Sequence, residues 1–224
     1  MRRALSASTR WVAEAPGSVA LVLITIGATT FDGAAEGTLA EPIRTVEDWC
    51  ADIGLGPVAA LRVTNSIFLA LSLGFVAGLF WAGIYGMHTV RTGLSTRRLG
   101  ALFAHAFIPI ALAYLTAHYF SLFVFQEQAQ FGYLLSDPLG NGHTDLFGTA
   151  SGGIDFKVLS SNAIWYVQVG ALVVGHVIGL TLAHDRAVAY WKDYRQAAHS
   201  QYWMLAVMVA FTCFGLYLLS VGAS

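Results

Sequence analysis

LGALFAHAFIPIALAYLTAHYFSLFVF (residues 99–125) and SNAIWYVQVGALVVGHVIGLTLA (residues 161–183) are the two stretches that decide the fold. Each is an apolar run longer than the about 20 residues that a helix needs to cross the ~30 Å hydrocarbon core of a bilayer. Histidines interrupt both runs, His105 and His118 in the first and His176 in the second. The two stretches therefore predict membrane-spanning helices that carry ionisable groups.

The composition of the whole chain is also that of a membrane protein. Its 224 residues are 56% hydrophobic and 11% charged, whereas a soluble domain is about 25% charged. Three further apolar runs are long enough, or nearly so, to span. We therefore predict an all-α, polytopic helical bundle in a single transmembrane domain over residues 1–224. The predicted spans are residues 17–31, 58–86, 99–125, 161–183 and 202–221, and the predicted outer loops are residues 32–57 and 126–160.

The charges between the spans predict the orientation. Nine of the twelve basic residues fall on one side: Arg2, Arg3, Arg10, Arg91, Arg97, Arg98, Arg186, Lys192 and Arg195. The two opposite loops collect most of the acids. Because basic loops stay in the cytoplasm, we predict a plasma-membrane protein with its N-terminus inside and its C-terminus outside. The first span is predicted to be an uncleaved anchor, and a signal peptide is the open alternative.

Local features refine this bundle. Pro109 lacks the N–H that would bond the carbonyl of His105, so we expect a kink and a freed carbonyl beside that histidine. In the first outer loop, apolar residues at helical spacing over 45–55 predict an amphipathic helix. Two pairs of glycines spaced four apart predict faces that let another helix approach closely: Gly74 with Gly78, and Gly175 with Gly179.

The three histidines inside the spans are candidate metal ligands. Ionisable groups within membrane spans indicate a functional site, and neutral imidazole binds Zn, Cu and Fe. We therefore predict that His105, His118 and His176 bind a transition-metal ion. The alternative is that each is a neutral packing residue held by hydrogen bonds. At ~100° per residue, His105 and His118 point about 140° apart, so each is expected to face a different helix.

The second outer loop contains a candidate set that we rank below the histidines. Asp137, His143 and Asp145 could bind a divalent ion, and the alternative is a solvated, turn-rich loop. The sequence contains no GxSxG, P-loop or HExxH motif, so nucleophilic serine chemistry has no support and no catalytic residue is named. The net charge of −1 gives no indication of nucleic-acid binding.

Several stretches resemble the C-terminal half of a family of actinobacterial multi-pass proteins, the membrane-bound fenitrothion hydrolase-like proteins. They are FAHAFIPIALAYLTAHYFSLFVFQEQAQ (103–130), SDPLGNGHTDLFGTA (136–150), IDFKVLSSNAIWYVQVGALVVGHVIGLTLAHDRA (154–187) and SQYWMLAVMVAFTCFGLYLL (200–219). The resemblance implies organophosphate hydrolysis, and His105, His118, His143 and His176 lie in the matching segments. The family's N-terminal half is absent, so the resemblance implies either a shorter variant or a separate membrane chain that supplies that half. A homo-oligomer is the alternative partner.

Three functional hypotheses follow. The first is a metal-dependent phosphotriester hydrolase in which the metal activates a bound water. The second is a non-enzymatic membrane subunit, or a permease for a metal ion or small molecule. The third is a haem or copper redox subunit. The spacing of His105 and His118 is similar to that of a copper-binding helix in the C subunit of particulate methane and ammonia monooxygenases, where a carboxylate takes the place of Ala101.

Overall fold

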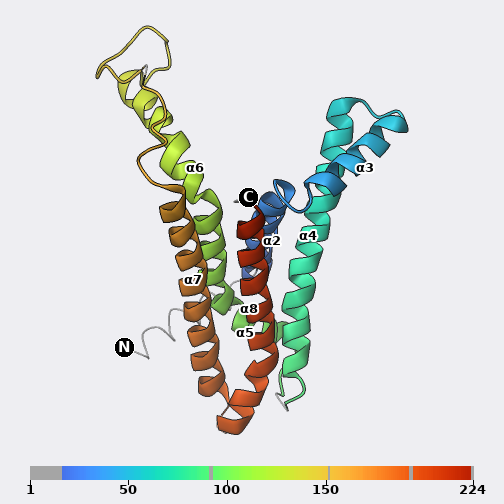
Figure 1. The fold of residues 1–224 in the computed structure, drawn as a ribbon. Helices are drawn as coiled ribbons and strands as arrows, with labels where there is room; N and C mark the ends of the chain where they lie inside the picture. Colours follow the sequence, from blue (N-terminus) through green and yellow to red (C-terminus); the bar gives the residue numbers. More distant parts are fainter. Residues whose placement is uncertain (1–16, 91–92, 151, 192–193, 223–224) are drawn as a thin grey trace. The chain divides into compact units, whose positions relative to one another are not determined.

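The structure, a computed structural model, describes residues 17–90, 93–150, 152–191 and 194–222. These residues form helices joined by turns and loops, without a strand, which confirms the all-α prediction (Figure 1). The elements are α2 (Ser18–Ala35), α3 (Ala40–Asp52), α4 (Pro57–Met87), α5 (Thr96–Ala104), the 3₁₀ turn η1 (His105–Phe107), α6 (Ile108–Ser136), α7 (Ser161–Tyr190) and α8 (Tyr194–Gly222).

Five helical segments are long and apolar enough to cross a membrane, as predicted. They are Ser18–Ala35, Pro57–Met87, Thr96–Ser136, Ser161–Tyr190 and Arg195–Leu218. Three of them extend well past the predicted bounds, because α6 ends at Ser136 rather than at 125, α7 ends at Tyr190 rather than at 183, and α8 begins at Tyr194 rather than at 202. Polar residues end an apolar run without ending a helix, since helical backbone hydrogen bonds form equally well outside lipid.

The predicted orientation rests partly on residues outside those described, which include Arg2, Arg3, Arg10, Arg91 and Lys192. It therefore stays a prediction. The predicted amphipathic helix of the first loop is α3, which packs on α4. Its residue Cys50 is 2% exposed and lies 3.8 Å from the hydroxyl of Thr64 on α4. Because it is buried, Cys50 is poorly suited to thiol labelling that would show on which side of the membrane this loop lies.

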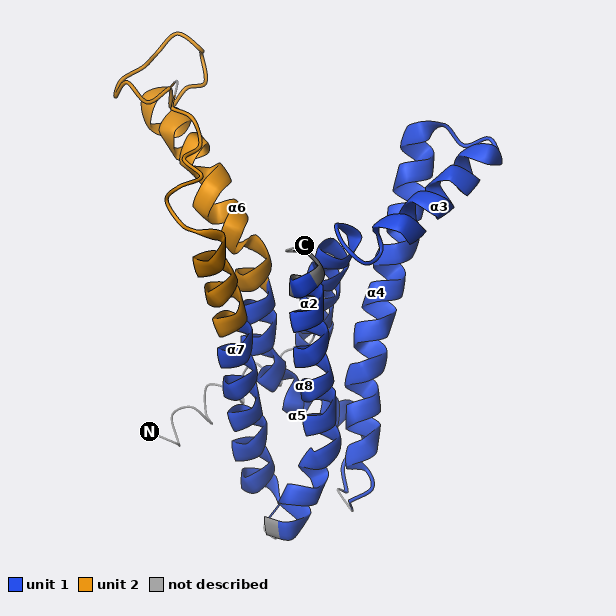
Figure 2. Cartoon of the chain, viewed as in Figure 1, with its two compact units in different colours: residues 1–114, 172–224 blue, residues 115–171 orange. Residues whose placement is uncertain are grey.

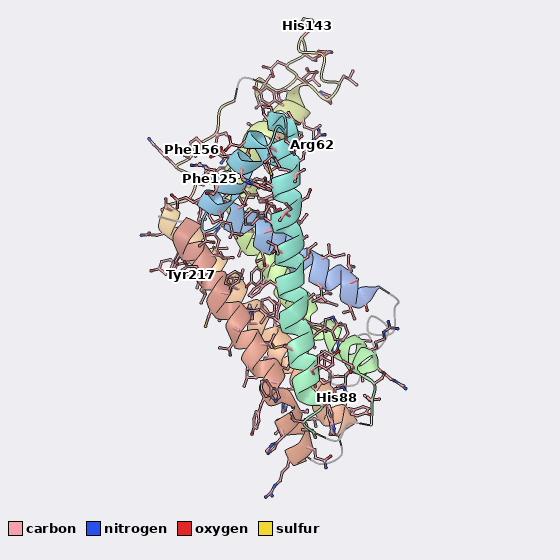
Figure 3. All side chains as sticks on the ribbon, turned by 90° about the vertical axis from the view of Figure 1, so that its right-hand side faces the viewer. Arg62, His88, Phe125, His143, Phe156 and Tyr217 are labelled. Carbon is pink, nitrogen blue, oxygen red and sulfur yellow. The ribbon has the colours of Figure 1, made fainter. Side chains whose placement is uncertain are left out.

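The chain divides into two compact units (Figure 2). Unit 1 contains residues 1–114 and 172–224, and unit 2 contains residues 115–171. Within unit 1, α4 packs on α2, α3 and α8, and Arg62 and His88 lie towards its opposite ends (Figure 3). The Ser72 hydroxyl of α4 donates a 2.8 Å hydrogen bond to the Gly27 carbonyl of α2. The single transmembrane domain remains a prediction, because two compact units can belong to one domain.

The third span changes from an α-helix to a 3₁₀ turn beside His105, where Pro109 predicts a kink, but the carbonyl of His105 is not left free as expected. α5 ends at Ala104, and residues 105–107 form a 3₁₀ turn before α6 begins. The N–H of Ile108 donates to the carbonyl of His105 in this tighter turn. The carbonyl that Pro109 leaves without its usual donor is thereby satisfied inside the span, as an apolar surrounding requires.

The two predicted helix faces with paired glycines differ in whether another helix packs against them. A Cβ atom added at Gly175 would overlap with the Cβ of Ala113, and one added at Gly179 would lie 2.6 Å from the carbonyl oxygen of Ala106. These glycines of α7 therefore allow close contact with η1 and α6. At Gly74 and Gly78 of α4, no described atom lies within 4 Å of the added Cβ. That face is open in the described part of the chain.

Gly175→Ala is expected to destabilise the protein, because its methyl group would overlap with Ala113. Overpacking of this kind costs roughly 1–3 kcal/mol. Gly74→Ala is the matched control, because its methyl group enters open space and alanine is the better helix former by about 0.5–1 kcal/mol. Thermal unfolding in detergent should show a lower midpoint for Gly175→Ala alone. Equal midpoints for the two variants would contradict the close contact between α6 and α7.

The orientation can be tested with single cysteines in a Cys50→Ala, Cys213→Ala background. Asp52→Cys on α3 and Gln196→Cys on α8 are both exposed positions. The charge pattern predicts that a membrane-impermeant thiol reagent labels Asp52→Cys on intact cells and Gln196→Cys only after lysis. The opposite labelling pattern would invert the topology.

Candidate functional site

One ring nitrogen of His176 in α7 makes a hydrogen bond, and the other has no hydrogen-bond partner among the described residues. The side chain is 7% exposed, and its Nδ1 lies 2.7 Å from the carbonyl oxygen of Leu172. Because a carbonyl only accepts, we assign the proton to Nδ1, which leaves a lone pair on Nε2. No described group bonds to Nε2, which is buried. Metal-ligating histidines have this arrangement, with the second ring nitrogen donating to a carbonyl or carboxylate.

Tyr114 of α6 lies beside this histidine. The two ring centroids are 6.2 Å apart and tilted by 58°. The Tyr114 hydroxyl donates a 2.6 Å hydrogen bond to the carbonyl of Phe211 on α8. Since its proton is used there, Tyr114 cannot donate to Nε2 of His176. The buried lone pair on Nε2 of His176 therefore has no donor among the described residues.

His105 lies in a different electrostatic environment. It is 3% exposed, and its buried Nδ1 has no hydrogen-bond partner among the described residues, although the Leu102 carbonyl is near the ring. The guanidinium of Arg186 is within electrostatic reach. A positive charge close to an imidazole disfavours binding of a metal cation there, because like charges repel. His105 is therefore a poorer cation ligand than His176.

His105 belongs to the third span, and His176 packs against another face of that span from α7. Tyr114, which lies beside His176, follows His105 by nine residues along the chain. At ~100° per residue that separation is about 180°, and the 3₁₀ turn changes this angle only by tens of degrees. We therefore treat His105 and His176 as two sites.

His118 belongs to unit 2 and is half-buried. Its ring packs edge-on against the neighbouring ring of Tyr119, with centroids 4.7 Å apart. One residue earlier, the carbonyl of Ala117 accepts a 2.8 Å hydrogen bond from Gln168 of α7. Polar contact between the two helices of unit 2 is therefore made by Gln168, a residue that is absent from the predicted site.

The 137–160 loop uses its polar groups to form its own turns. Asp137 accepts hydrogen bonds from the backbone N–H groups of Asn141 (3.1 Å) and Gly142 (2.6 Å). The side-chain oxygen of Asn141 accepts in turn from the N–H of His143, at the tip of the loop (Figure 3). Phe156 packs on Phe125 of α6, with ring centroids 5.4 Å apart. These contacts agree with the turn-rich interpretation of the loop.

A second set of hydrogen bonds joins this loop to the end of α6. The hydroxyl oxygens of Ser136 and Thr149 lie 2.6 Å apart, and that of Thr149 lies 3.0 Å from the Gly132 carbonyl oxygen. A hydrogen bond from the Ser136 hydroxyl, helped by the N–H of Ala150 at 3.3 Å, holds the pKa of the Asp145 carboxyl below its ordinary value. The ionised carboxylate therefore stabilises the folded loop.

Because the folded-state pKa of Asp145 is lowered, its stabilising effect is present above the ordinary aspartate pKa of about 4 and is lost as the pH falls through the lowered value. Asp145→Asn should remove the effect at neutral pH. Hydrogen–deuterium exchange at pH 7 is expected to be faster for residues 145–150 in this variant and unchanged in Asp52→Asn, an exposed control on α3. Unchanged exchange in Asp145→Asn would show that the carboxylate does not hold the loop.

The described residues contain no group of three or more His, Cys, Asp or Glu side chains placed to hold a metal ion. All seven histidines lie in the described part of the chain. The predicted ligands His105, His118 and His176, and the lower-ranked Asp137, His143 and Asp145, are therefore not gathered into one cluster. A metal ion at any of them would have fewer than three such protein ligands from this chain.

Comparison with known proteins adds no assignment. The chain matches no protein-family profile, no curated protein and no solved structure.

Proposed function

We propose that this multi-pass membrane protein is a permease for a transition-metal ion, with His176 as an intramembrane ligand. The observation that carries the proposal is the fixed state of the His176 ring. Its Nδ1 proton is committed to the Leu172 carbonyl at 2.7 Å, so the ligating lone pair of Nε2 is available without deprotonation. Ionisable side chains inside membrane spans mark ion pathways.

The distribution of the buried histidines favours transport over catalysis. A catalytic zinc site holds its metal with three protein ligands and keeps a further position open for water. The described side chains form no such group. A site with fewer ligands releases its ion more readily, which suits an ion that must leave again. Further ligands would come from a second copy or from a separate membrane chain.

The second candidate function is the phosphotriester hydrolysis implied by the fenitrothion hydrolase-like resemblance. The apolar surroundings of His176, with Tyr114 beside it and Leu172 one turn away, favour an uncharged, apolar substrate. A bound metal would supply an activated water there. Release of the leaving group from an apolar phosphotriester by the purified protein tests this alternative. The visible spectrum of the same sample tests the haem and copper redox alternative.

Metal binding by the purified, detergent-solubilised chain tests the proposal. Equilibrium dialysis against Zn²⁺ or Cu²⁺ is expected to show saturable binding of the metal to the wild type. His176→Asn should lose it, since the amide can keep a hydrogen bond to Leu172 but removes the imidazole. His199→Ala, at an exposed histidine, is the control and should keep the metal. Full binding by His176→Asn would overturn the assignment of the ligand.

Transport is measured separately in proteoliposomes that contain a metal-sensitive dye. Wild-type vesicles are expected to take up the metal ion faster than protein-free vesicles, and His176→Asn vesicles should match the protein-free rate. Uptake by His176→Asn at the wild-type rate would contradict the permease proposal even if the histidine binds metal.

A further inference from the structure

Unit 2 exposes a group of large apolar side chains at the end that contains the 137–160 loop. We call this group the apolar tip, and its members are Phe131, Leu134, Leu135, Leu139, Leu146 and Phe147. Their exposed fractions run from 52% for Phe131 to 86% for Leu139. Soluble protein surfaces rarely expose apolar patches larger than a few hundred Å² unless a partner covers them. The tip therefore requires an account of what it contacts.

Hydrogen bonds hold the two segments of the tip together. The backbone N–H of Leu146 donates a 3.0 Å hydrogen bond to the Ser136 carbonyl, and that of Thr149 donates a 3.1 Å bond to the Ser136 hydroxyl. The polar groups of the loop are thus used to fix its own backbone, while its leucine and phenylalanine side chains are exposed. Because the loop is already fixed, a partner would bind a preformed surface and little conformational freedom would be lost.

The length and polarity of α6 argue against acyl chains as the cover. The helix has 29 residues, so at ~1.5 Å per residue it is ~43 Å long, whereas the hydrocarbon core is ~30 Å thick. Four polar residues precede the tip in the same unbroken helix: Gln126, Glu127, Gln128 and Gln130. A carboxylate such as that of Glu127 is costly within hydrocarbon. When α6 spans the bilayer, the tip therefore lies beyond the acyl chains, and a protein surface is needed to cover it.

We propose that the apolar tip joins two copies of this chain. Half-exposed leucine and phenylalanine side chains present roughly 100 Å² each, so six of them approach the about 800 Å² that each partner contributes to a standard interface. The tip carries no charged side chain, and the nearby carboxylates of Asp137 and Asp145 accept hydrogen bonds from backbone N–H groups of the loop. An isologous contact therefore sets apolar against apolar side chains in both copies. It uses no contact of His176, so it is independent of the permease proposal.

Disulfide cross-linking in native membranes tests the contact. Phe147→Cys in a Cys50→Ala, Cys213→Ala background is expected to form a disulfide-linked dimer on mild oxidation, because an isologous contact of so small a surface brings this position close to its own copy. Ile53→Cys in the same background is the matched control, since Ile53 is an exposed apolar residue just after α3. It should cross-link only at the level of random collisions.

Two aspartate variants, made in the Phe147→Cys background, locate the effect. Leu134→Asp and Leu139→Asp each place the same charge in both copies at the contact. Because like charges across an interface repel, the yield of the cross-linked dimer is expected to fall roughly tenfold or more. Ile53→Asp should keep the full yield. Both leucines are exposed, so the thermal unfolding midpoints of these variants should match that of the parent and show that the fold is retained.

The other occupants of the tip give different results. The proposal is overturned if Phe147→Cys cross-links no more than Ile53→Cys, or if both aspartate variants keep the full yield. A fluorophore on Phe147→Cys that is quenched by brominated lipids, with no dimer formed, would show that acyl chains cover the tip. The absence of both a dimer and quenching would indicate a different protein partner, and it would equally overturn the contact between two copies.

Discussion

The requirement that every backbone polar group within lipid has a partner governs this structure. It leaves helices as the spanning elements of this chain, and it explains the tight turn at residues 105–107. Pro109 removes a donor there, and Ile108 supplies another by bonding to His105 one residue earlier than an α-helix would. The buried imidazole of His176 also needs a partner for its proton, and Nδ1 finds it in the Leu172 carbonyl at 2.7 Å. This side-chain bond determines which nitrogen of His176 remains available.

Close packing of α7 on the third span then separates the two histidines. Gly175 and Gly179 bring the two backbones together, because each meets an atom of η1 or α6 that a side chain would displace. The ring of His176 lies beside that of Tyr114, whereas His105 is within electrostatic reach of Arg186. The positive charge near His105 leaves His176 as the imidazole better suited to a cation.

Much of the fold is predictable from the sequence, because apolar run length and proline chemistry act locally. The five spanning segments, the departure from a regular α-helix before Pro109 and the close contact at Gly175 and Gly179 follow from such local rules. The positions where helices end beyond the bilayer do not follow from these rules. Hydropathy indicates which residues lie in lipid, but it does not indicate where the helical backbone stops. The open face at Gly74 and Gly78 could not be predicted from local rules either. Small residues allow another helix to approach closely, but they do not determine whether a helix packs there.

The candidate site was only partly predictable for a related reason. Depth along a helix identifies His105, His118 and His176, but the carbonyl that accepts from Nδ1 and the charge near His105 depend on three-dimensional contacts. X-ray absorption spectroscopy of the zinc- or copper-loaded protein tests whether His176 is a ligand of the metal. The spectrum is expected to show the scattering pattern of imidazole nitrogen in the first coordination shell, and His176→Asn is expected to lose it. A shell of oxygen ligands alone, or an imidazole pattern unchanged in that variant, would contradict this assignment.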